Sequence, residues 1–481
     1  MLQQIWSLFS QENAPTDMHA IPCTALDVWP RDLFVTNGII VDHRLDAVKL
    51  EESISTLIKT KFQRAGARFA VRNGTYEFLI PRTFSEEVKP LVFTTDNYAE
   101  TYATPIGGRP AIPVRPSRVS VASVQPCPAL EVYFRSKTCP VNLKSCLAGR
   151  LPILHVHVTT FDDITFIGIT VSHGLFDTLG TAAFLSAWTR LINGEDINDI
   201  PGMPLDCAPF EAFADKPSAT PPRGWSQLGL LQGMYFGARM LWKMWHEPEE
   251  KMMLICVPKA FVEDQKASIM AELQAQKSAE WVGSSDVLLA WFCKTMHHHR
   301  DTADQTPIII HTAVDLRPLH IWKDGKPLSH PYIHNAMSTI TPPPIPASTL
   351  ANSSVADLAL QIRRAIKVYT ADLEAIRADI SFRCANPIKV LIPCTPDGEA
   401  VIHSNWRTAK FGQLDFTGAA VAMDAGAKAT VRCMLAYFPS SIPLRGSSVV
   451  LSEDDETLWM FYVASSQEWE RIKQSGAVQF I

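Results

Sequence analysis

The sequence has no long apolar run. No stretch of its 481 residues approaches the ~18 uninterrupted apolar residues of a transmembrane helix. Residues 1–6 also lack the basic start and the continuous apolar segment of a secretion signal. We therefore expect a cytoplasmic protein without a membrane span.

Clustered metal ligands are missing as well. The ten cysteines are scattered singly, without a C-x-x-C pair or a short His/Cys group of zinc spacing. His155 and His157 share one face of a predicted strand, but no third ligand follows nearby. We expect reduced, mostly buried thiols and no metal site.

An excess of positive charge is also absent. The chain has 44 Lys and Arg against 49 Asp and Glu, a net charge of -5, and the two signs alternate along the sequence. This balance argues against nucleic-acid binding. With 47% hydrophobic and 19% charged residues, the composition is typical of a well-packed globular protein.

The length predicts two domains, because 481 residues exceed one ordinary core. Between residues 201 and 250 prolines interrupt regular structure, and Gly229 to Trp245 is rich in large apolar residues. We interpret 201–250 as a crossover linker between an N-terminal domain of residues 1–200 and a C-terminal domain of residues 251–481.

Helical and strand patterns alternate in both halves. The first half predicts a helix over 46–62, short strands over 67–71 and 75–80, and a hairpin over 153–172. The second half predicts strands at 253–257 and 308–314, helices at 258–274 and 284–296, a hairpin over 447–464, and a last helix capped at Ser465. No glycine-rich phosphate loop follows a strand, so mixed sheets fit better than a parallel Rossmann sheet.

The segment from His173 to Asp177 follows a predicted strand over 164–172 directly. Thr165, Ile167, Ile169 and Val171 share the parity of His173, so its imidazole projects from the mostly apolar face of the strand. A partly desolvated imidazole at a strand end can take a proton from a bound nucleophile. His173 is therefore a candidate general base.

A helix is predicted to begin at Asp177 and to close at Asn193-Gly194. Asp177 would then be its N-cap. For an arbitrary H-x-x-x-D, a satisfied core histidine followed by a capping aspartate is the commoner explanation. The strand-to-helix setting favours a functional site here.

Four segments in order resemble the BAHD acyltransferase family, most closely its fungal trichothecene-acetyltransferase-like branch. Ser172–Asp177 looks like the H-x-x-x-D motif, and Val314–Pro318 looks like the V-D-x-R strand end. Residues 332–336 look like Y-x-x-N-A, and 404–418 look like the S-W and D-F-G-W-G region. The resemblance covers nearly the whole chain.

The resemblance implies two chloramphenicol-acetyltransferase-like α/β domains with mixed sheets and a channel between them. His173 would deprotonate an acceptor hydroxyl, which would attack the thioester of acyl-CoA without a covalent enzyme intermediate. Asp177 would pair with Arg317 as a structural support of the site, although an aspartate that orients the histidine stays open. Acyl-CoA would be a co-substrate rather than a permanently bound cofactor, and the protein would be a monomer.

Three further residues are carried over from the resemblance. Trp406 is the candidate donor near the developing oxyanion, with Ser404 as a second candidate, and plain core packing is the alternative for the tryptophan. Ser285 would approach CoA from a helix N-terminus, where simple N-capping is the alternative.

The sequence departs from the family pattern at two places, and the second departure concerns the branch and the packing on the CoA side more than the chemistry. Thr178 replaces the glycine that usually follows the motif aspartate, and Phe416-Thr417-Gly418 lacks the usual F-G-W-G.

The leading interpretation is an O-acyltransferase, with acetyl as the default group, acting on a terpenoid or polyketide secondary metabolite. N-acylation of an amine, condensation with a carrier-protein thioester and a catalytically idle binding protein on the same fold stay open.

Overall fold

The computed structural model describes residues 17–103, 108–113, 122–149, 151–213, 218–424, 426–439 and 442–481. Residues 1–6, on which the absence of a secretion signal was argued, lie outside the described residues. Within the described ranges, none of the helices combines the length and the apolar character needed to cross a membrane.

A five-stranded mixed sheet forms the centre of the first half. Its order is β14 (Val431–Tyr437), β2 (Phe34–Val41), β8 (Thr165–Ser172), β7 (His155–Thr160) and β5 (Val92–Asn97). The predicted hairpin over 153–172 is confirmed, since β7 and β8 pair antiparallel with His155 opposite Thr170. Every residue of β8 is buried, so the strand that delivers His173 runs through the middle of the sheet.

A nine-stranded mixed sheet forms the centre of the second half. Its order is β11 (Met337–Ile340), β10 (Pro307–Asp315), β13 (Glu399–Asn405), β15 (Ser447–Glu453), β16 (Thr457–Ser465), β9 (Glu250–Pro258), β6 (Ser123–Pro126) and β17 (Gln479–Phe480), with β12 (Ile345–Pro346) beside β10. Strands β10 and β13 are parallel, and both point their carboxyl ends toward the first half. This sheet therefore positions the residues that follow Asp315 and Asn405.

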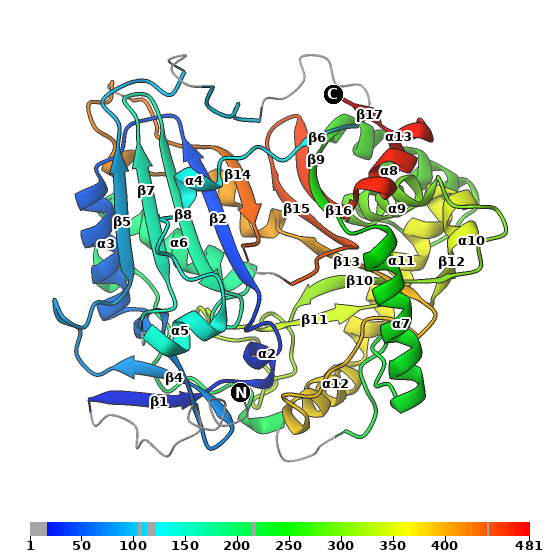
Figure 1. Ribbon diagram of the computed structural model, residues 1–481, viewed down its shortest axis with the longest axis horizontal. Coiled ribbons are helices and arrows are strands. Elements are labelled where there is room, and N and C mark those ends of the chain that lie inside the picture. Colours follow the sequence, from blue (N-terminus) through cyan, green and yellow to red (C-terminus); the bar gives the residue numbers. More distant parts are fainter. Residues whose placement is uncertain are drawn as a thin grey trace.

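The two large sheets exchange strands. Strand β14 comes from the end of the chain but pairs with β2 of the first half, whereas β6 comes from the first half and pairs with β9. Figure 1 shows the five-stranded sheet on the left and the nine-stranded sheet on the right, with β14 between them. A boundary at residues 201–250 would assign β6 and β14 to the half in which they do not pair. The domain boundaries stay a prediction.

A small antiparallel sheet lies below the five-stranded sheet in Figure 1. It consists of β1 (Met18–Pro22), β4 (Thr75–Pro81) and β3 (Arg68–Arg72). The single turn of helix α2 (Ala25–Val28) follows β1 along the chain. Thr24 and Asp27 form a capping box that fixes this turn. The two predicted strands near residue 70 are thus confirmed as β3 and β4.

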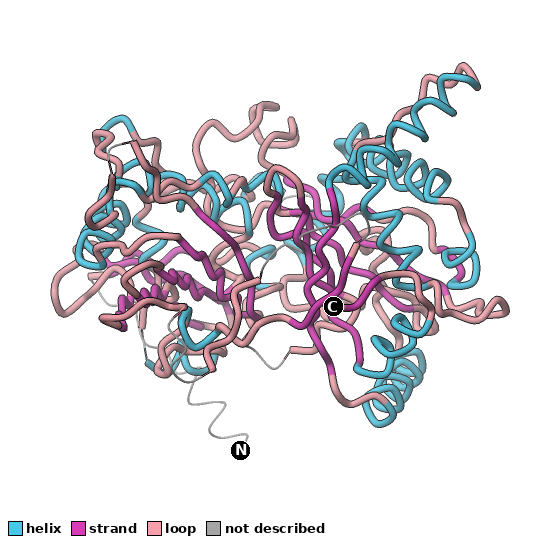
Figure 2. The backbone as a smooth tube through the Cα atoms, turned by 90° about the horizontal axis from the view of Figure 1, so that it is seen from above, coloured by secondary structure: helices cyan, strands magenta, loops and turns pink. Residues whose placement is uncertain are grey.

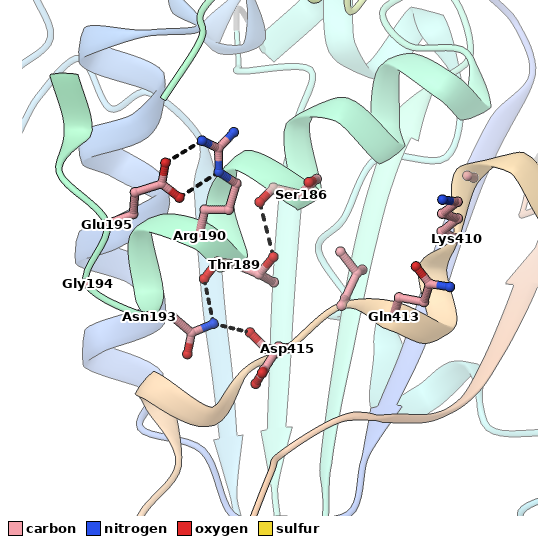
Figure 3. Close-up of a pocket in the computed structure, with 11 residues that line it drawn as sticks. Ser186, Thr189, Arg190, Asn193, Gly194, Glu195, Lys410, Gln413 and Asp415 are labelled. Atoms are coloured by element: carbon pink, nitrogen blue, oxygen red, sulfur yellow. Dashed lines mark hydrogen bonds and ion pairs between the residues drawn. The ribbon is translucent and has the colours of Figure 1, made fainter. Parts of the chain in front are cut away.

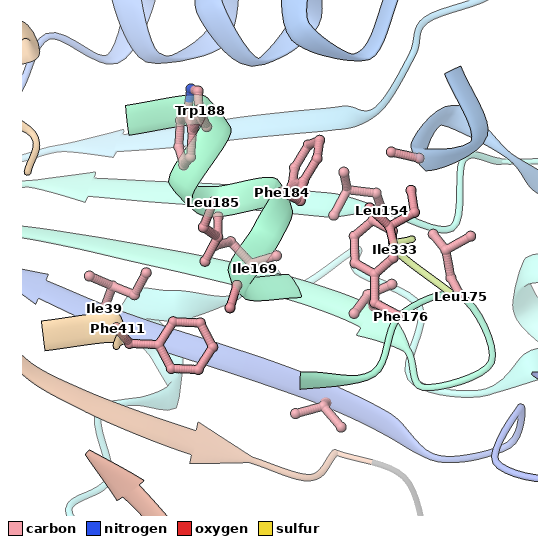
Figure 4. Packing of buried hydrophobic residues seen from close by; sticks show 14 of the residues in the cluster. Ile39, Leu154, Ile169, Leu175, Phe176, Phe184, Leu185, Trp188, Ile333 and Phe411 are labelled. Atoms are coloured by element: carbon pink, nitrogen blue, oxygen red, sulfur yellow. The ribbon is translucent and has the colours of Figure 1, made fainter. Parts of the chain in front are cut away.

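Helix α6 (Thr178–Ile192) packs its apolar face on the five-stranded sheet. Phe184, Leu185 and Trp188 lie over Ile169 and Ile39, as Figure 4 shows. The other helices of this half are α3 (Ala47–Thr60), α4 (Glu131–Phe134) and α5 (Leu143–Gly149). The indole of Trp188 donates to Ser53 of α3 over 2.9 Å, which joins the two long helices.

Helices cover the nine-stranded sheet on the side away from the first half. Figure 2 shows them in cyan, outside the strands in magenta. They are α7 (Leu230–His246), α8 (Lys259–Ala275), α9 (Ser284–His297), α10 (Ala347–Asn352), α11 (Val355–Ala371), α12 (Leu373–Ala385) and α13 (Ser466–Gln474). Helix α9 is buried over almost its whole length between the sheet and α8, α10 and α11. The predicted helices at 258–274 and 284–296 are thereby confirmed.

The first turn of α6 touches the backbone of a distant segment. A Cβ atom on Gly180 would lie 1.9 Å from the carbonyl oxygen of Ile333, so only glycine permits this approach. Replacement by alanine must push the helix and the 332–336 segment apart. The segment 332–336 carries Asn335, whose side chain contacts the ring of His173.

We expect Gly180→Ala to lower the free energy of unfolding by about 1–3 kcal/mol, the usual cost of overpacking. Gly237→Ala is the matched control, because its helical position has open space around the added methyl group and alanine favours helix. Urea unfolding of both variants checks this. Equal stability of Gly180→Ala and the parent would show that the close approach is not required.

Candidate active site

His173 follows β8 and points its ring at a segment of the second half. Its backbone N–H donates to the carbonyl of Leu33 over 2.7 Å, and the side chain is partly exposed. The ring Nδ1 lies 3.1 Å from Oδ1 of Asn335. The predicted base is therefore held by backbone and side-chain contacts on both sides.

The contacts of Asn335 fix the tautomer of His173. The amide nitrogen of Asn335 donates to the carbonyl of His173 over 2.8 Å and to Oδ1 of Asp27 over 3.0 Å. The amide oxygen is therefore the atom that faces the ring, and a carbonyl oxygen only accepts. Nδ1 of His173 must carry the proton, which leaves the lone pair on Nε2.

Asp27 closes this network from the turn α2. Its carboxylate accepts from the backbone and the hydroxyl of Thr24 and from the backbone of Asn335. Burial raises the pKa of Asp27 to about 6, although the hydrogen bonds from Thr24 and Asn335 oppose the shift. A carboxylate thus lies behind the amide that holds His173.

Sequence reasoning missed both Asn335 and Asp27 as site residues. Asn335 was within the Y-x-x-N-A segment, but no spacing rule connects it to His173, 162 positions away. Asp27 stands three residues after Thr24, which signals a cap rather than a site.

Asp177 is the N-cap of α6, as predicted. Its Oδ1 accepts from the backbone of Gly180 over 2.7 Å, and its Oδ2 accepts from the backbone of Ala336 over 2.9 Å. Nη2 of Arg317 donates to Oδ1 over 2.8 Å, so the expected ion pair with Arg317 is present. The carboxylate is occupied by these three donors, whereas the ring of His173 is held by Asn335.

Arg317 follows β10 and connects three chain segments. It donates to Asp177, to Oδ1 of Asp315 and to the carbonyls of Tyr332 and His334. Burial opposes the charge of Arg317, but Asp177 and Asp315 raise its pKa above the ordinary value. The ion pair therefore ties the start of α6 to the segment that presents Asn335.

A pocket between the two halves brings together most of the predicted site residues. Asp177 and Arg317 line it with Ser285 of α9 and with Ser404 and Trp406 at the end of β13. The Nε1 of Trp406 donates to the hydroxyl of Ser404 over 3.0 Å. The indole N–H is thus taken by Ser404, and the hydroxyl proton of Ser404 is left to point elsewhere.

The mouth of this pocket carries cations. Ser285, the second residue of α9, accepts from Asn405 over 3.2 Å and from the guanidinium of Arg407. Arg407 also pairs with Glu453, and Lys410 lines the same pocket. This mouth combines a helix N-terminus with two positive side chains, which suits a phosphate-bearing ligand.

A second hollow opens at the other end of α6 and shares Lys410 with this pocket. Figure 3 shows Arg190 paired with Glu195, and Asn193 donating to the carbonyls of Thr189 and Asp415. The residues of α6 that line this hollow begin at Ser186, nine residues or about 13 Å along the helix from Asp177.

Asn335 lines a narrow apolar cavity of about 20 Å³. Trp29 and Trp225 form its walls with their rings edge to face at 5.4 Å, and the guanidinium of Arg383 lies 4.8 Å from the Trp225 ring centre. Met337 lines both this cavity and the pocket between the halves. His173 is not among the residues that line the pocket between the halves or this cavity.

We expect Asp177→Asn to lower the free energy of unfolding by about 3 kcal/mol, because it leaves the buried Arg317 without its main partner while keeping an N-capping side chain. Asp46→Asn is the matched control. Asp46 caps α3 by accepting from Val48 and Lys49 at the surface, so we expect little change. Guanidinium unfolding measures both, and parental stability of Asp177→Asn would contradict the supporting role of the ion pair.

Comparison with known proteins identifies the family. The Transferase family matches residues 138–461. The chain is 25% identical over 458 residues to the O-acyltransferase pboC of Aspergillus ustus, covering 90% of this chain and 93% of that protein. It is 28% identical over 436 residues to the acetyltransferase pyiB of Pyricularia grisea, covering 86% and 82%.

Among solved structures, the fold is similar to F. graminearum TRI101 complexed with coenzyme A and T-2 mycotoxin, with a TM-score of 0.67 at 13% identity over 95% of this chain and 97% of that chain. The predicted fold class, a mixed α/β fold with mixed sheets, is confirmed. The chain belongs to the Transferase family, the BAHD acyltransferases, and is an acyltransferase.

Proposed function

We propose that the protein transfers an acyl group, acetyl by default, from acyl-CoA to a hydroxyl of a terpenoid or polyketide secondary metabolite. The observation that carries this proposal is the tautomer of His173, whose Nδ1–H is fixed by Asn335 and whose Nε2 keeps its lone pair. The names of the curated relatives, an O-acyltransferase and an acetyltransferase, support the reaction class. The coenzyme A in the complex of TRI101 supports the donor.

In this mechanism Nε2 of His173 takes the proton of the acceptor hydroxyl while the oxygen attacks the thioester carbonyl. The tetrahedral intermediate collapses and expels CoA thiolate, which receives the proton from Nε2. The imidazolium that forms in between keeps its Nδ1–H on Asn335, and Asn335 donates to the carboxylate of Asp27. The negative charge of Asp27 polarises this amide and so stabilises the positively charged imidazolium of His173.

The two co-substrates are proposed to bind in the pocket between the halves, which has a volume of about 530 Å³. Arg407, Lys410 and the N-terminus of α9 at Ser285 would hold the phosphates of CoA at the mouth of the pocket between the halves. The acceptor would contact the apolar residues Val314, Met337 and Ile340 of the same pocket. The cavity walled by Trp29 and Trp225, with a volume of about 20 Å³, has room for about one water molecule.

We expect His173→Ala to lower the turnover number by about 10²–10⁴, the usual contribution of a general base. Release of free thiol from acetyl-CoA, measured with a panel of hydroxylated terpenoid and polyketide acceptors, checks this. Binding of CoA by titration calorimetry is the control, since it should be unchanged in His173→Ala and weakened in Arg407→Ala. Parental turnover in His173→Ala would refute the proposed base, and a parent without any thiol release would favour a binding protein.

Ser404, oriented by Trp406, is proposed to donate its hydroxyl proton to the oxyanion of the tetrahedral intermediate. Loss of one such donor costs about 10²–10³ in turnover, so we expect that loss for Ser404→Ala. Trp406→Phe removes the orienting N–H but keeps the hydroxyl, and we expect a smaller loss. If Trp406→Phe loses as much as Ser404→Ala or more, the indole itself is the donor.

A further inference from the structure

His403 of β13 is a buried histidine with one free ring nitrogen. Its side chain is 2% exposed, and its ring centre lies 6.2 Å from that of Phe292 of α9. Nδ1 lies 2.8 Å from the hydroxyl of Ser448. Nε2 has no hydrogen-bond partner among the described residues, and it is not sealed within the core. Since His403 lines the pocket between the halves, Nε2 is the atom that opens onto this pocket.

Thr312 of β10 stands directly beside His403. The two residues are partners in the parallel pairing of β10 and β13, so their side chains project from the same face of the sheet, on strands about 4.8 Å apart. Thr312 is half-buried and lines the same pocket. In the described part of the chain no group forms a hydrogen bond with its hydroxyl. An imidazole nitrogen and a hydroxyl are thus presented together.

This polar pair is uncharged. Burial and the nearby Arg407 lower the pKa of His403 to about 4, so the imidazole is neutral near pH 7. A neutral imidazole nitrogen and a hydroxyl suit a neutral ligand group, whereas a phosphate is better held by the cations at the pocket mouth. An amide matches the pair well, because it carries both a donor and an acceptor.

The surface around the pair is apolar. Ile340 of β11 pairs with Thr312 on its other side. Leu289 of α9 and Ile362 and Ile366 of α11 line the same pocket. A polar group enclosed by apolar walls costs free energy when it has no partner. The unpaired imidazole and hydroxyl therefore indicate a place where a ligand supplies the hydrogen bonds.

The pair lies close to the proposed phosphate site. Asn405 follows His403 by two residues on β13, so the two side chains share a face of the strand about 6–7 Å apart. The amide of Asn405 donates to Ser285 at the start of α9, and Arg407 donates to the same hydroxyl. A ligand with its phosphates at Ser285 and Arg407 reaches the pair with the atoms that follow its diphosphate.

We propose that His403 and Thr312 bind an amide of the pantetheine arm of the acyl donor. This arm is the neutral chain that joins the diphosphate of CoA to its thiol, and it carries two amides. The role rests on the proposed function, which makes acyl-CoA the donor. A carrier protein presents the same arm without the nucleotide, so the two sources differ in what lies at the pocket mouth.

Titration calorimetry of the full chain with CoA, phosphopantetheine and 3′,5′-ADP tests this role. The amide of His403→Asn can keep the bond to Ser448 but does not reach the position of Nε2. We expect Thr312→Val and His403→Asn to bind CoA about three- to tenfold more weakly, the loss of one neutral hydrogen bond, and to bind 3′,5′-ADP as the parent does. His403→Gln brings an amide to the position of Nε2 and should bind CoA more tightly than His403→Asn.

Thr95→Val is the matched control. Thr95 of β5 is exposed and is not among the residues that line the pocket, so this variant should bind CoA as the parent does. Loss of 3′,5′-ADP binding in His403→Asn would show that this variant is misfolded, and Thr312→Val, which removes one hydroxyl and keeps the shape of the side chain, then decides the question.

Parental CoA affinity in both Thr312→Val and His403→Asn would overturn this role and leave the proposed donor in place. If the acceptor KM rises in the same variants, the pair binds the acceptor instead. A parent that binds none of the three probes would refute acyl-CoA as the donor and this role with it. Phosphopantetheine that binds as tightly as CoA would keep the role of the pair and assign the arm to a carrier protein.

Discussion

The contact between Asp177 and Arg317 joins the two halves of the molecule at the site. The carboxylate of Asp177 caps α6, accepts from the backbone of Ala336 and pairs with a guanidinium that also holds the carbonyls of Tyr332 and His334. Because the segment 332–336 is fixed from both ends in this way, Asn335 has one position relative to β8. Gly180 lets the first turn of α6 approach the same segment without a side chain between them.

The proposed chemistry depends on this fixed position of Asn335. An imidazole can present either nitrogen to a substrate, and the partner of the other nitrogen decides which one. Asn335 donates to the carbonyl of His173 and to Asp27, so its oxygen can only face Nδ1. In the proposed mechanism Asp177 does not contact His173 but positions the segment that carries Asn335. The carboxylate behind the Asn335 amide is that of Asp27.

Local patterns predicted much of the fold. The alternation along 153–172, the cap at Asp177 and the stop at Asn193-Gly194 became β7, β8 and α6, since each depends on neighbouring residues. The exchange of β6 and β14 could not be predicted, because pairing between distant strands leaves no local signal. Asn335 and Asp27 were missed for the same reason. The roles given to His173, Ser404, Trp406 and Ser285 stay predictions.

Nitrogen NMR of the His173 ring tests the central claim most directly. Long-range proton–nitrogen spectra of histidine-labelled protein, with His173→Gln to assign the signals, distinguish a protonated ring nitrogen from one with a lone pair. The structure predicts a protonated Nδ1 and an unprotonated Nε2 for the neutral ring, and loss of that preference in Asn335→Ala. A protonated Nε2 in the neutral ring of the parent would contradict the account, because the base would then face Asn335 instead of the substrate.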